Sequence, residues 1–186
     1  FKTVVKTAAL RNGLYACFSP KPIPGQAGNG MHINMSVKCS DGTDRSEAFL
    51  AGVLAHVREI TAFLNPTEES YRRFGEMKAP RYITWSPENR SQLIRIPAAK
   101  GEYRRIELRS PDPTANPYLA YALLIRAGLD GIQKGMLPPQ PVNENLYTAP
   151  RSLTAALEQL PSSLTEAKQI ARSSPFVAAI LPEAML

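Results

Sequence analysis

Strict alternation of apolar and polar residues marks the segment from residue 31 to residue 37. The apolar residues are Met31, Ile33, Met35 and Val37, and the polar residues are His32, Asn34 and Ser36. A period of two predicts a strand with one face on a core and the other face available for chemistry. The preceding residues 21–30 include two prolines and three glycines, so this loop can bend tightly and approach a ligand closely. The loop and strand resemble a binding site, although an edge strand with a solvated polar face has the same pattern.

Apolar residues recur at helical spacing in three longer segments. The first covers residues 1–13 and ends at a glycine. The second covers residues 46–64, with Ser46 as its expected N-cap and a continuous apolar stripe that predicts a core-facing helix. The third begins at Asn116-Pro117, a cap followed by a proline at the first helical position, and is expected to finish near residue 131.

Four shorter segments have the pattern of strands. They span residues 14–19, 81–85, 91–96 and 104–109. We expect a loop with about one helical turn over residues 67–80 and a turn at Lys100-Gly101. Short helices are expected after Ser152 and after Ser163. At the second of these, Ser163 and Glu166 have capping-box spacing.

Composition and length narrow the class of protein. A chain of 186 residues that is 44% hydrophobic and 20% charged is typical of one globular domain. No apolar run approaches the roughly 20 residues of a membrane span, and the N-terminus lacks a signal-peptide pattern. Cys17 and Cys39 fit neither a disulfide framework nor a zinc site, so we expect a reduced, cytoplasmic setting. The chain starts at Phe1 inside an expected helix, and we expect it to be part of a larger protein.

Positive charge is concentrated between Arg72 and Arg109. This segment contains ten basic and four acidic residues, whereas the rest of the chain is neutral. Eight of the ten are arginines, which grip carboxylate and phosphate groups in a bidentate way better than lysine does. The charge pattern implies an anionic partner and leaves two kinds open, nucleic acid and small molecules that carry phosphate or carboxylate groups.

One strand face carries an acid between two bases, Arg105, Glu107 and Arg109. Such an acid is held ionised and can be either a structural salt-bridge partner or a metal ligand. With a divalent cation present, Glu107 and His32 could supply one oxygen and one nitrogen ligand, since Mg²⁺ and Mn²⁺ sites that hold nucleotide phosphates use few protein ligands. The other histidine, His56, lies beside the apolar stripe of its helix, and we interpret it as structural.

Five ordered blocks of sequence resemble the glutamine synthetase family, the first of them its ATP-binding signature. They are Lys21-Pro22 with Gly28-Asn29-Gly30-Met31-His32 and Ser36, Asn65-Pro66-Thr67 with Ser70-Tyr71-Arg72-Arg73, Asn89-Arg90-Ser91 with Ile94-Arg95-Ile96-Pro97, Arg105 through Pro113, and Ala115 through Leu119. The resemblance implies the family's α+β catalytic domain, an antiparallel sheet with packed helices, with residues 1–186 as part of it. The family's N-terminal small domain and the first part of its catalytic domain have no counterpart here. We therefore expect a truncated domain with little or no activity alone.

The resemblance also implies an activity and a set of functional residues. The family joins ammonia to glutamate at the expense of ATP through a γ-glutamyl phosphate, with two Mg²⁺ or Mn²⁺ ions. The matching positions are His32 and Glu107 for the metal, Arg90 and Arg95 for the phosphoryl group in transfer, Gly28, Arg73 and Arg109 for glutamate, and Ser36, Asn34 and Arg105 for the nucleotide. Family members form their sites between subunits of stacked rings, so a ring-shaped homo-oligomer is implied, without a nucleic-acid or membrane partner.

The chain departs from the family's pattern at the amine side of the site. The family usually has a second histidine at the position of Asn34 and an asparagine at that of Ala27. Its loop glutamate, which shields the intermediate and helps to deprotonate ammonium, is replaced by Lys78 in a loop one residue shorter. A lysine there repels ammonium. Either Glu76 takes over this catalytic role through a loop shift, or the amine is a polyamine or another amine, and ammonia is the default.

Two further alternatives concern the whole chain and one tyrosine. One alternative interpretation is a non-catalytic family member, and another is a nucleic-acid-binding module built on the basic segment. Against the nucleic-acid module, the arginines lie within ligase motifs and lack interleaved aromatic residues. Tyr147 occupies a position where some bacterial members are adenylylated, and we favour a packing role for it.

Overall fold

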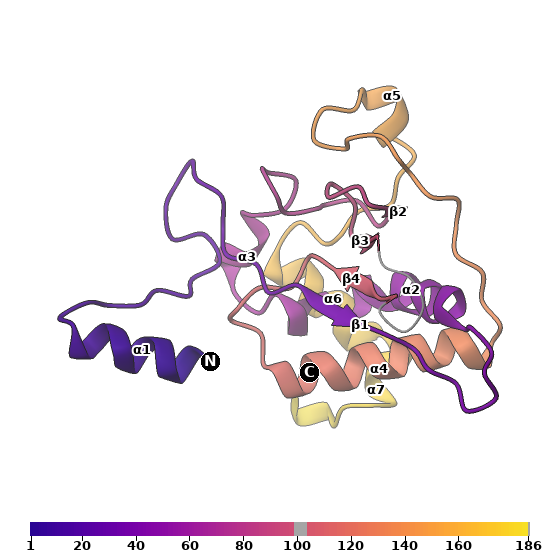
Figure 1. Ribbon diagram of the computed structural model, residues 1–186, viewed down its shortest axis with the longest axis horizontal. Helices are drawn as coiled ribbons and strands as arrows, with labels where there is room; N and C mark the ends of the chain where they lie inside the picture. The colour runs from indigo at the N-terminus through magenta and orange to yellow at the C-terminus, as the bar shows by residue number, and fades with distance from the viewer. Residues whose placement is uncertain (99–103, 186) are drawn as a thin grey trace.

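Two long helices, α2 (Ser46–Leu64) and α4 (Pro117–Gln133), pack against each other along one side of the sheet (Figure 1). The structure is a computed structural model that describes residues 1–98 and 104–185, so the expected turn at Lys100-Gly101 lies outside the described residues. Both helices were predicted from their apolar spacing. Each buries one stripe, and these stripes join a single hydrophobic cluster with the sheet.

Glycines bring the two helix backbones into direct contact. A Cβ atom added at Gly52 of α2 would lie 2.2 Å from the carbonyl oxygen of Ala127 and 2.7 Å from the backbone nitrogen of Gly131. A Cβ atom added at Gly131 would lie 2.1 Å from the carbonyl oxygen of Ala48. Gly131 therefore serves helix packing, and it does not end the helix, since α4 continues past it to Gln133.

The ends of the predicted helices show which residues cap them. Asn116 caps α4 as expected, because its side chain accepts a hydrogen bond from the backbone N–H of Tyr118. Ser163 likewise caps α6 (Leu164–Ser173) by accepting from the N–H of Glu166. The expectation that Ser46 caps α2 is wrong. Ser46 is the first helical residue, and the carboxylate of Asp44 accepts a hydrogen bond from its backbone N–H.

A four-stranded sheet packs its apolar face on these helices. Its strands are β1 (Ile33–Met35), β2 (Trp85–Pro87), β3 (Ile94–Ile96) and β4 (Ile106–Leu108), in the order β1-β4-β3-β2. The pairings of β4 with β1 and β3 are antiparallel, as expected, whereas β2 runs parallel to β3. Apolar side chains such as Ile33, Ile94 and Leu108 join the core on one face. The other face carries a polar row across the sheet.

The predicted strands are longer than the observed ones, and one is absent. Residues 14–19 form no strand, so that prediction is wrong, and the neighbouring backbone serves the loop instead, since the carbonyl oxygens of Ser19 and Pro20 accept hydrogen bonds from Asn29. Residues 81–83 pair with residues 158–160 rather than with the sheet. A strand needs a neighbour, and sequence alternation does not reveal where that neighbour lies.

Short helices complete the described structure. They are α1 (Lys2–Arg11), α3 (Glu68–Tyr71), α5 (Arg151–Thr154), α7 (Pro175–Ala178) and the 3₁₀ helix η2 (Glu183–Met185). α1 buries no residue and extends away from the core in Figure 1, while α6 and α7 pack on α2. His56 links three helices, because its ring contacts Glu59 and Asp130 and stacks on Phe176. In the described part of the chain, no helix is long and apolar enough to cross a membrane.

The glycine contact between α2 and α4 gives a prediction on stability. Gly52→Ala should lower the free energy of unfolding by about 1–3 kcal/mol, because the new methyl group meets backbone atoms that cannot rotate away. The measurement is a denaturant titration followed by circular dichroism. Ala55→Ser, on the exposed face of the same helix, should change it by less than about 0.5 kcal/mol. Equal effects of the two substitutions would contradict the contact.

Candidate active site

A cavity of about 520 Å³ opens next to the polar face of the sheet. Its walls come from the loop before β1, the loop after α3, the strands β3 and β4 with the turn before them, and the segment after α4. The lining residues are Gly28, Gly30, His32, Arg73, Met77, Lys78, Ala79, Arg90, Arg95, Glu107, Arg109 and Tyr147. Five of them are arginine or lysine and one is an acid, so the cavity suits an anionic ligand.

Glu107 is the acid around which this cavity is organised. It lies on β4, one of the two central strands of the sheet, directly across from Arg95 on β3. Its Oε2 atom accepts a hydrogen bond from Arg95 Nε at 2.6 Å and lies 3.7 Å from Arg109 Nη1. Burial raises the pKa of Glu107, but the hydrogen bond from Arg95 and the charges of Arg109 and Arg95 outweigh it and hold the pKa below the usual range. The carboxylate is ionised at neutral pH.

His32 lies against the second oxygen of the same carboxylate. Its Nδ1 atom is 2.9 Å from Glu107 Oε1. Burial and the charge of Arg109 lower the pKa of His32 from its ordinary 6.5, although Glu107 acts in the opposite direction. The imidazole is therefore neutral near pH 7, the form in which histidine binds metals. The structure thus brings together the two predicted metal ligands from strands far apart in the chain.

The pair fits a divalent ion that takes few protein ligands. Neighbouring ligands of octahedral Mg²⁺, with bonds of about 2.1 Å, are about 3.0 Å apart, close to the separation of His32 Nδ1 and Glu107 Oε1. Among the described residues, no group of three or more His, Cys, Asp or Glu side chains could hold a metal. The remaining ligands would have to be phosphate oxygens, water or groups outside the described residues.

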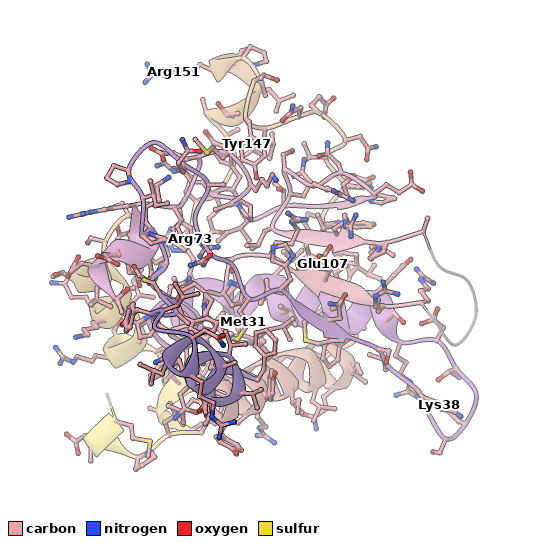
Figure 2. The ribbon with its side chains drawn as sticks, turned by 60° about the vertical axis from the view of Figure 1, so that its left-hand side comes forward. Met31, Lys38, Arg73, Glu107, Tyr147 and Arg151 are labelled. Atoms are coloured by element: carbon pink, nitrogen blue, oxygen red, sulfur yellow. The ribbon has the colours of Figure 1, made fainter. Side chains whose placement is uncertain are left out.

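Arg73 and Gly28 are held together on the opposite wall. A Cβ atom at Gly28 would lie 2.3 Å from the carbonyl oxygen of Pro20 and 2.8 Å from Arg73 Cγ, so only glycine fits there. In Figure 2, Arg73, Glu107 and Tyr147 lie around the same part of the molecule, whereas Lys38 and Arg151 lie at its periphery. The glycine lets the loop backbone approach the arginine that was predicted to bind the same substrate.

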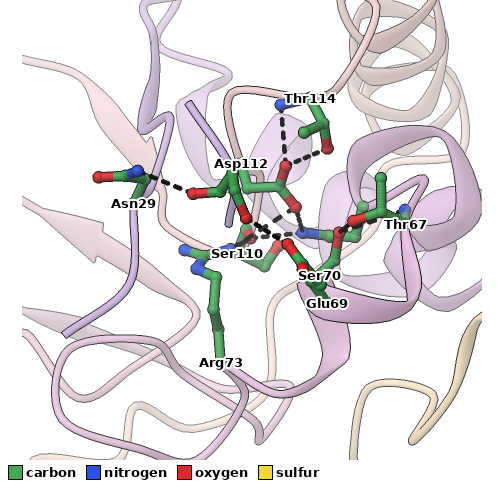
Figure 3. Close-up of polar contacts among 10 residues, drawn as sticks. Asn29, Thr67, Glu69, Ser70, Arg73, Ser110, Asp112 and Thr114 are labelled. Atoms are coloured by element: carbon green, nitrogen blue, oxygen red, sulfur yellow. Dashed lines mark hydrogen bonds and ion pairs between the residues drawn. The ribbon is translucent and has the colours of Figure 1, made fainter. Parts of the chain in front are cut away.

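A buried polar network fixes the orientation of Arg73 (Figure 3). Its Nη1 atom donates to the carbonyl oxygen of Ser110 at 3.1 Å and lies 3.8 Å from Asp112 Oδ2. Asn65 donates to the same carbonyl and to the same carboxylate. Both Arg73 and Asp112 are almost completely buried. The Asn-Pro-Thr block after α2 and the Pro-Asp-Pro block after β4 thus act by holding one arginine at the cavity.

The loop after α3 brings Lys78, not Glu76, to the cavity. Lys78 lines the cavity, while Glu76 does not and forms an ion pair of 2.9 Å with Lys21. The loop turns sharply here, with positive φ angles of 81° at Gly75 and 51° at Met77. The catalytic role predicted for Glu76 stays a prediction, and in this conformation its carboxylate is engaged outside the cavity.

The three residues predicted to bind the nucleotide lie beside the cavity rather than in its lining. Asn34 is directly opposite Glu107 in the sheet and accepts a hydrogen bond from Arg105 Nε at 3.1 Å. Ser36 lines a second cavity of about 500 Å³, together with Lys38 and Arg104. Asn34, Ser36 and Arg105 lie further along β1 and β4 than His32 does. One ligand could therefore extend from the first cavity along the β1 edge of the sheet.

Tyr147 is a cavity residue that sequence reasoning assigned to packing. Its segment is hydrogen-bonded to the Asn89-Arg90-Ser91 block: Asn89 Nδ2 donates to the carbonyl oxygens of Asn143 and Glu144, and Ser91 Oγ accepts from the N–H of Leu146. This block therefore has two roles. Arg90 lines the cavity, and Asn89 and Ser91 hold the segment that carries Tyr147, another lining residue. The Asn-Leu-Tyr sequence was the available signal, but nothing in it showed which surface the ring would face.

The comparisons with known proteins agree on one family. A sequence profile described as "Glutamine synthetase, catalytic domain" matches residues 1–186. A glutamine synthetase from Methanosarcina mazei is 43% identical over 98% of this chain and 44% of its own length, and one from Thermotoga maritima is 45% identical over 89% and 41%. A solved structure described as "GmaS/ADP complex-Conformation 1" is 34% identical, with a TM-score of 0.84 over 98% of this chain and 46% of that one. The chain spans less than half the length of these relatives.

The contact between His32 and Glu107 predicts how the histidine titrates. Because Glu107 raises the pKa of His32 while burial and Arg109 lower it, Glu107→Gln should lower this pKa further below that of the wild type. The measurement is an NMR titration of the His32 ring protons. The control is Glu158→Gln, because Glu158 is exposed, pairs with Arg58 and does not line the cavity. This substitution should leave the titration of His32 unchanged. A His32 pKa that is unchanged or higher in Glu107→Gln would contradict the contact.

Proposed function

The chain belongs to the glutamine synthetase family, as part of its catalytic domain, and from this premise we propose that it contributes to the active site of an ATP-dependent ligase that joins ammonia to glutamate. The observation that carries the proposal is the meeting of His32 and Glu107 beside a cavity rich in arginine. The basic residues converge on a cavity for small anions rather than forming a stripe with stacking aromatics, which argues against a nucleic-acid module.

The proposed roles follow from the positions of the side chains. Arg90 and Arg95 line the cavity and stabilise the phosphoryl group in transfer, a reaction in which positioning and electrostatics dominate. Arg73 and Arg109 hold the glutamate carboxylate, with the Gly28 backbone next to them. His32 and Glu107 hold a Mg²⁺ or Mn²⁺ ion, which when bound neutralises charge on the ATP phosphates.

ATP is the proposed nucleotide, bound along Asn34, Ser36 and Arg105. Asn34 and Arg105 are joined by a hydrogen bond, and the second cavity at Ser36 also has Lys38 and Arg104 in its lining. These cations suit the phosphates of a nucleotide. The solved relative described as an ADP complex supports an adenine nucleotide as the ligand.

Two kinds of amine are candidates for the third substrate of this reaction. Ammonia is the first candidate because both sequence relatives are glutamine synthetases. The second candidate is a γ-glutamyl ligase for a polyamine or another amine, because Lys78, which lines the cavity, replaces the loop glutamate that the family uses with ammonia. Glu107, the one acid in the lining, is already paired with Arg95, so the cavity offers an ammonium ion no free carboxylate among its lining residues.

The complete enzyme is proposed to be larger than this chain. The relatives are more than twice as long, and the two metal-facing side chains leave most ligand positions to other groups. We therefore propose a full-length protein that assembles as a ring-shaped homo-oligomer, in which further residues complete the site.

The proposed function predicts different activities for the full-length protein and for the 186-residue chain. The full-length protein should hydrolyse ATP in a coupled assay only when glutamate and an amine are present, and product analysis should show glutamine with ammonia. Putrescine in place of ammonia separates the second candidate. The isolated chain should show little or no turnover. Robust turnover by the isolated chain would contradict the proposal that its site is incomplete. Absence of an amide product from the full-length protein would contradict the proposal that it is a ligase.

Lys78 gives a prediction on amine affinity. Lys78→Gln should lower the KM for ammonium by about fivefold, since removing a like charge near a cation gains on the order of 1 kcal/mol. The measurement is steady-state kinetics of the full-length protein with ammonium varied. Lys168→Gln, exposed on α6, is the matched control and should leave KM unchanged. An unchanged or higher KM in Lys78→Gln would show that this lysine does not oppose the amine.

A further inference from the structure

Three buried polar atoms around the cavity have no hydrogen-bond partner among the described residues. They are Arg73 Nε, Arg109 Nε and the hydroxyl oxygen of Tyr147. All three residues line the same cavity. A buried donor without a partner costs free energy, and unpaired groups on residues that line one cavity indicate a ligand that completes them.

The ring of Tyr147 is held at this place by its own segment. Ser91 Oγ accepts a hydrogen bond from Leu146 N at 2.9 Å, Gln92 Nε2 donates to the carbonyl oxygen of Glu144 at 3.0 Å, and Tyr147 N donates to Asn145 Oδ1 at 3.1 Å. The backbone that leads into Tyr147 is therefore fixed to Ser91 and Gln92, just before β3. The polar contacts therefore fix the backbone that carries Tyr147, while its buried hydroxyl has no partner among the described residues.

The hydroxyl also lies in the field of both arginines. Burial raises the pKa of Tyr147, and the charges of Arg109 and Arg73 oppose that rise without reversing it. The phenol is therefore protonated at neutral pH, so its O–H can donate. The phenol O–H is a hydrogen-bond donor, like the Nε–H groups of the two arginines. A carboxylate can accept hydrogen bonds from several such donors at once.

We propose that Tyr147 is a third member of the carboxylate-binding wall, beside Arg73 and Arg109, and that its O–H donates to the carboxylate of the bound substrate. This inference rests on the proposed function, in which the two arginines bind glutamate. The hydroxyl is shielded from solvent in the free protein, so the ring of Tyr147 turns toward the ligand when it binds, while Arg73 keeps its orientation. The ligand class is a small carboxylic acid, and Tyr147 determines its affinity rather than the rate of phosphoryl transfer.

Tyr147→Phe tests the inference because it removes the hydroxyl and keeps the ring. Tyr71→Phe is the matched control: the hydroxyl of Tyr71 is also buried without a partner, but Tyr71 packs on Phe74 and does not line the cavity. In the full-length protein, isothermal titration with L-glutamate should give a Kd about tenfold weaker for Tyr147→Phe and an unchanged Kd for Tyr71→Phe. The KM for glutamate should rise by a similar factor while kcat stays within about twofold.

Thermal unfolding separates this role from packing. Each Phe variant removes an unpaired buried hydroxyl, so neither should lower the melting temperature. A Tyr147→Phe protein that binds glutamate like the wild type would overturn the inference, as would a wild type that binds no glutamate. Glutamate binding that is weakened in Tyr147→Phe, in a protein that forms no amide product, would contradict the proposed function and leave the inference intact.

Discussion

The site depends on the burial of one ionised carboxylate, Glu107, among positive and polar partners. Taking a carboxylate out of water is costly unless it is paired and hydrogen-bonded. Here Arg95 and Arg109 contact one oxygen and His32 contacts the other. Arg95 lies on β3, Arg109 directly follows β4 and His32 directly precedes β1, so satisfying this single charge requires β1, β4 and β3 to be in register. The polar face of the sheet is therefore both a structural and a chemical feature.

The rest of the fold supplies the rigidity that this arrangement needs. α2 and α4 meet through glycines at backbone contact, and the apolar face of the sheet joins their hydrophobic cluster. On the other side of the cavity, Asp112 and Asn65 fix the position of Arg73 through a buried network. The cavity thus lies between two different buried regions. One is the close-packed apolar cluster beneath the sheet, and the other is the buried polar network around Arg73. Side chains held from both sides are pre-organised for an anionic ligand.

The sequence was informative where local chemistry decides the structure. Apolar spacing located α2 and α4, Asn116 and Ser163 proved to be caps, and the ordered motifs gave the residues that meet at the cavity. It was uninformative where the partner is remote. The strand expected at residues 14–19 is absent, and Glu76 is paired with Lys21 instead of facing the cavity. The position of Tyr147 is set by hydrogen bonds to residues more than fifty positions earlier, which no local pattern encodes.

The most direct test of this account is to look for the divalent ion proposed to bind His32 and Glu107. Crystals of the full-length protein grown with Mn²⁺ and ADP would give an anomalous diffraction map in which the ion is identified without assumptions about its ligands. We predict an anomalous peak within bonding distance, about 2.0–2.3 Å, of both the His32 ring and the Glu107 carboxylate. Well-ordered Mn²⁺ peaks that all lie elsewhere, with His32 and Glu107 in contact only with each other and with arginines, would contradict the account and reduce the pair to a structural salt bridge.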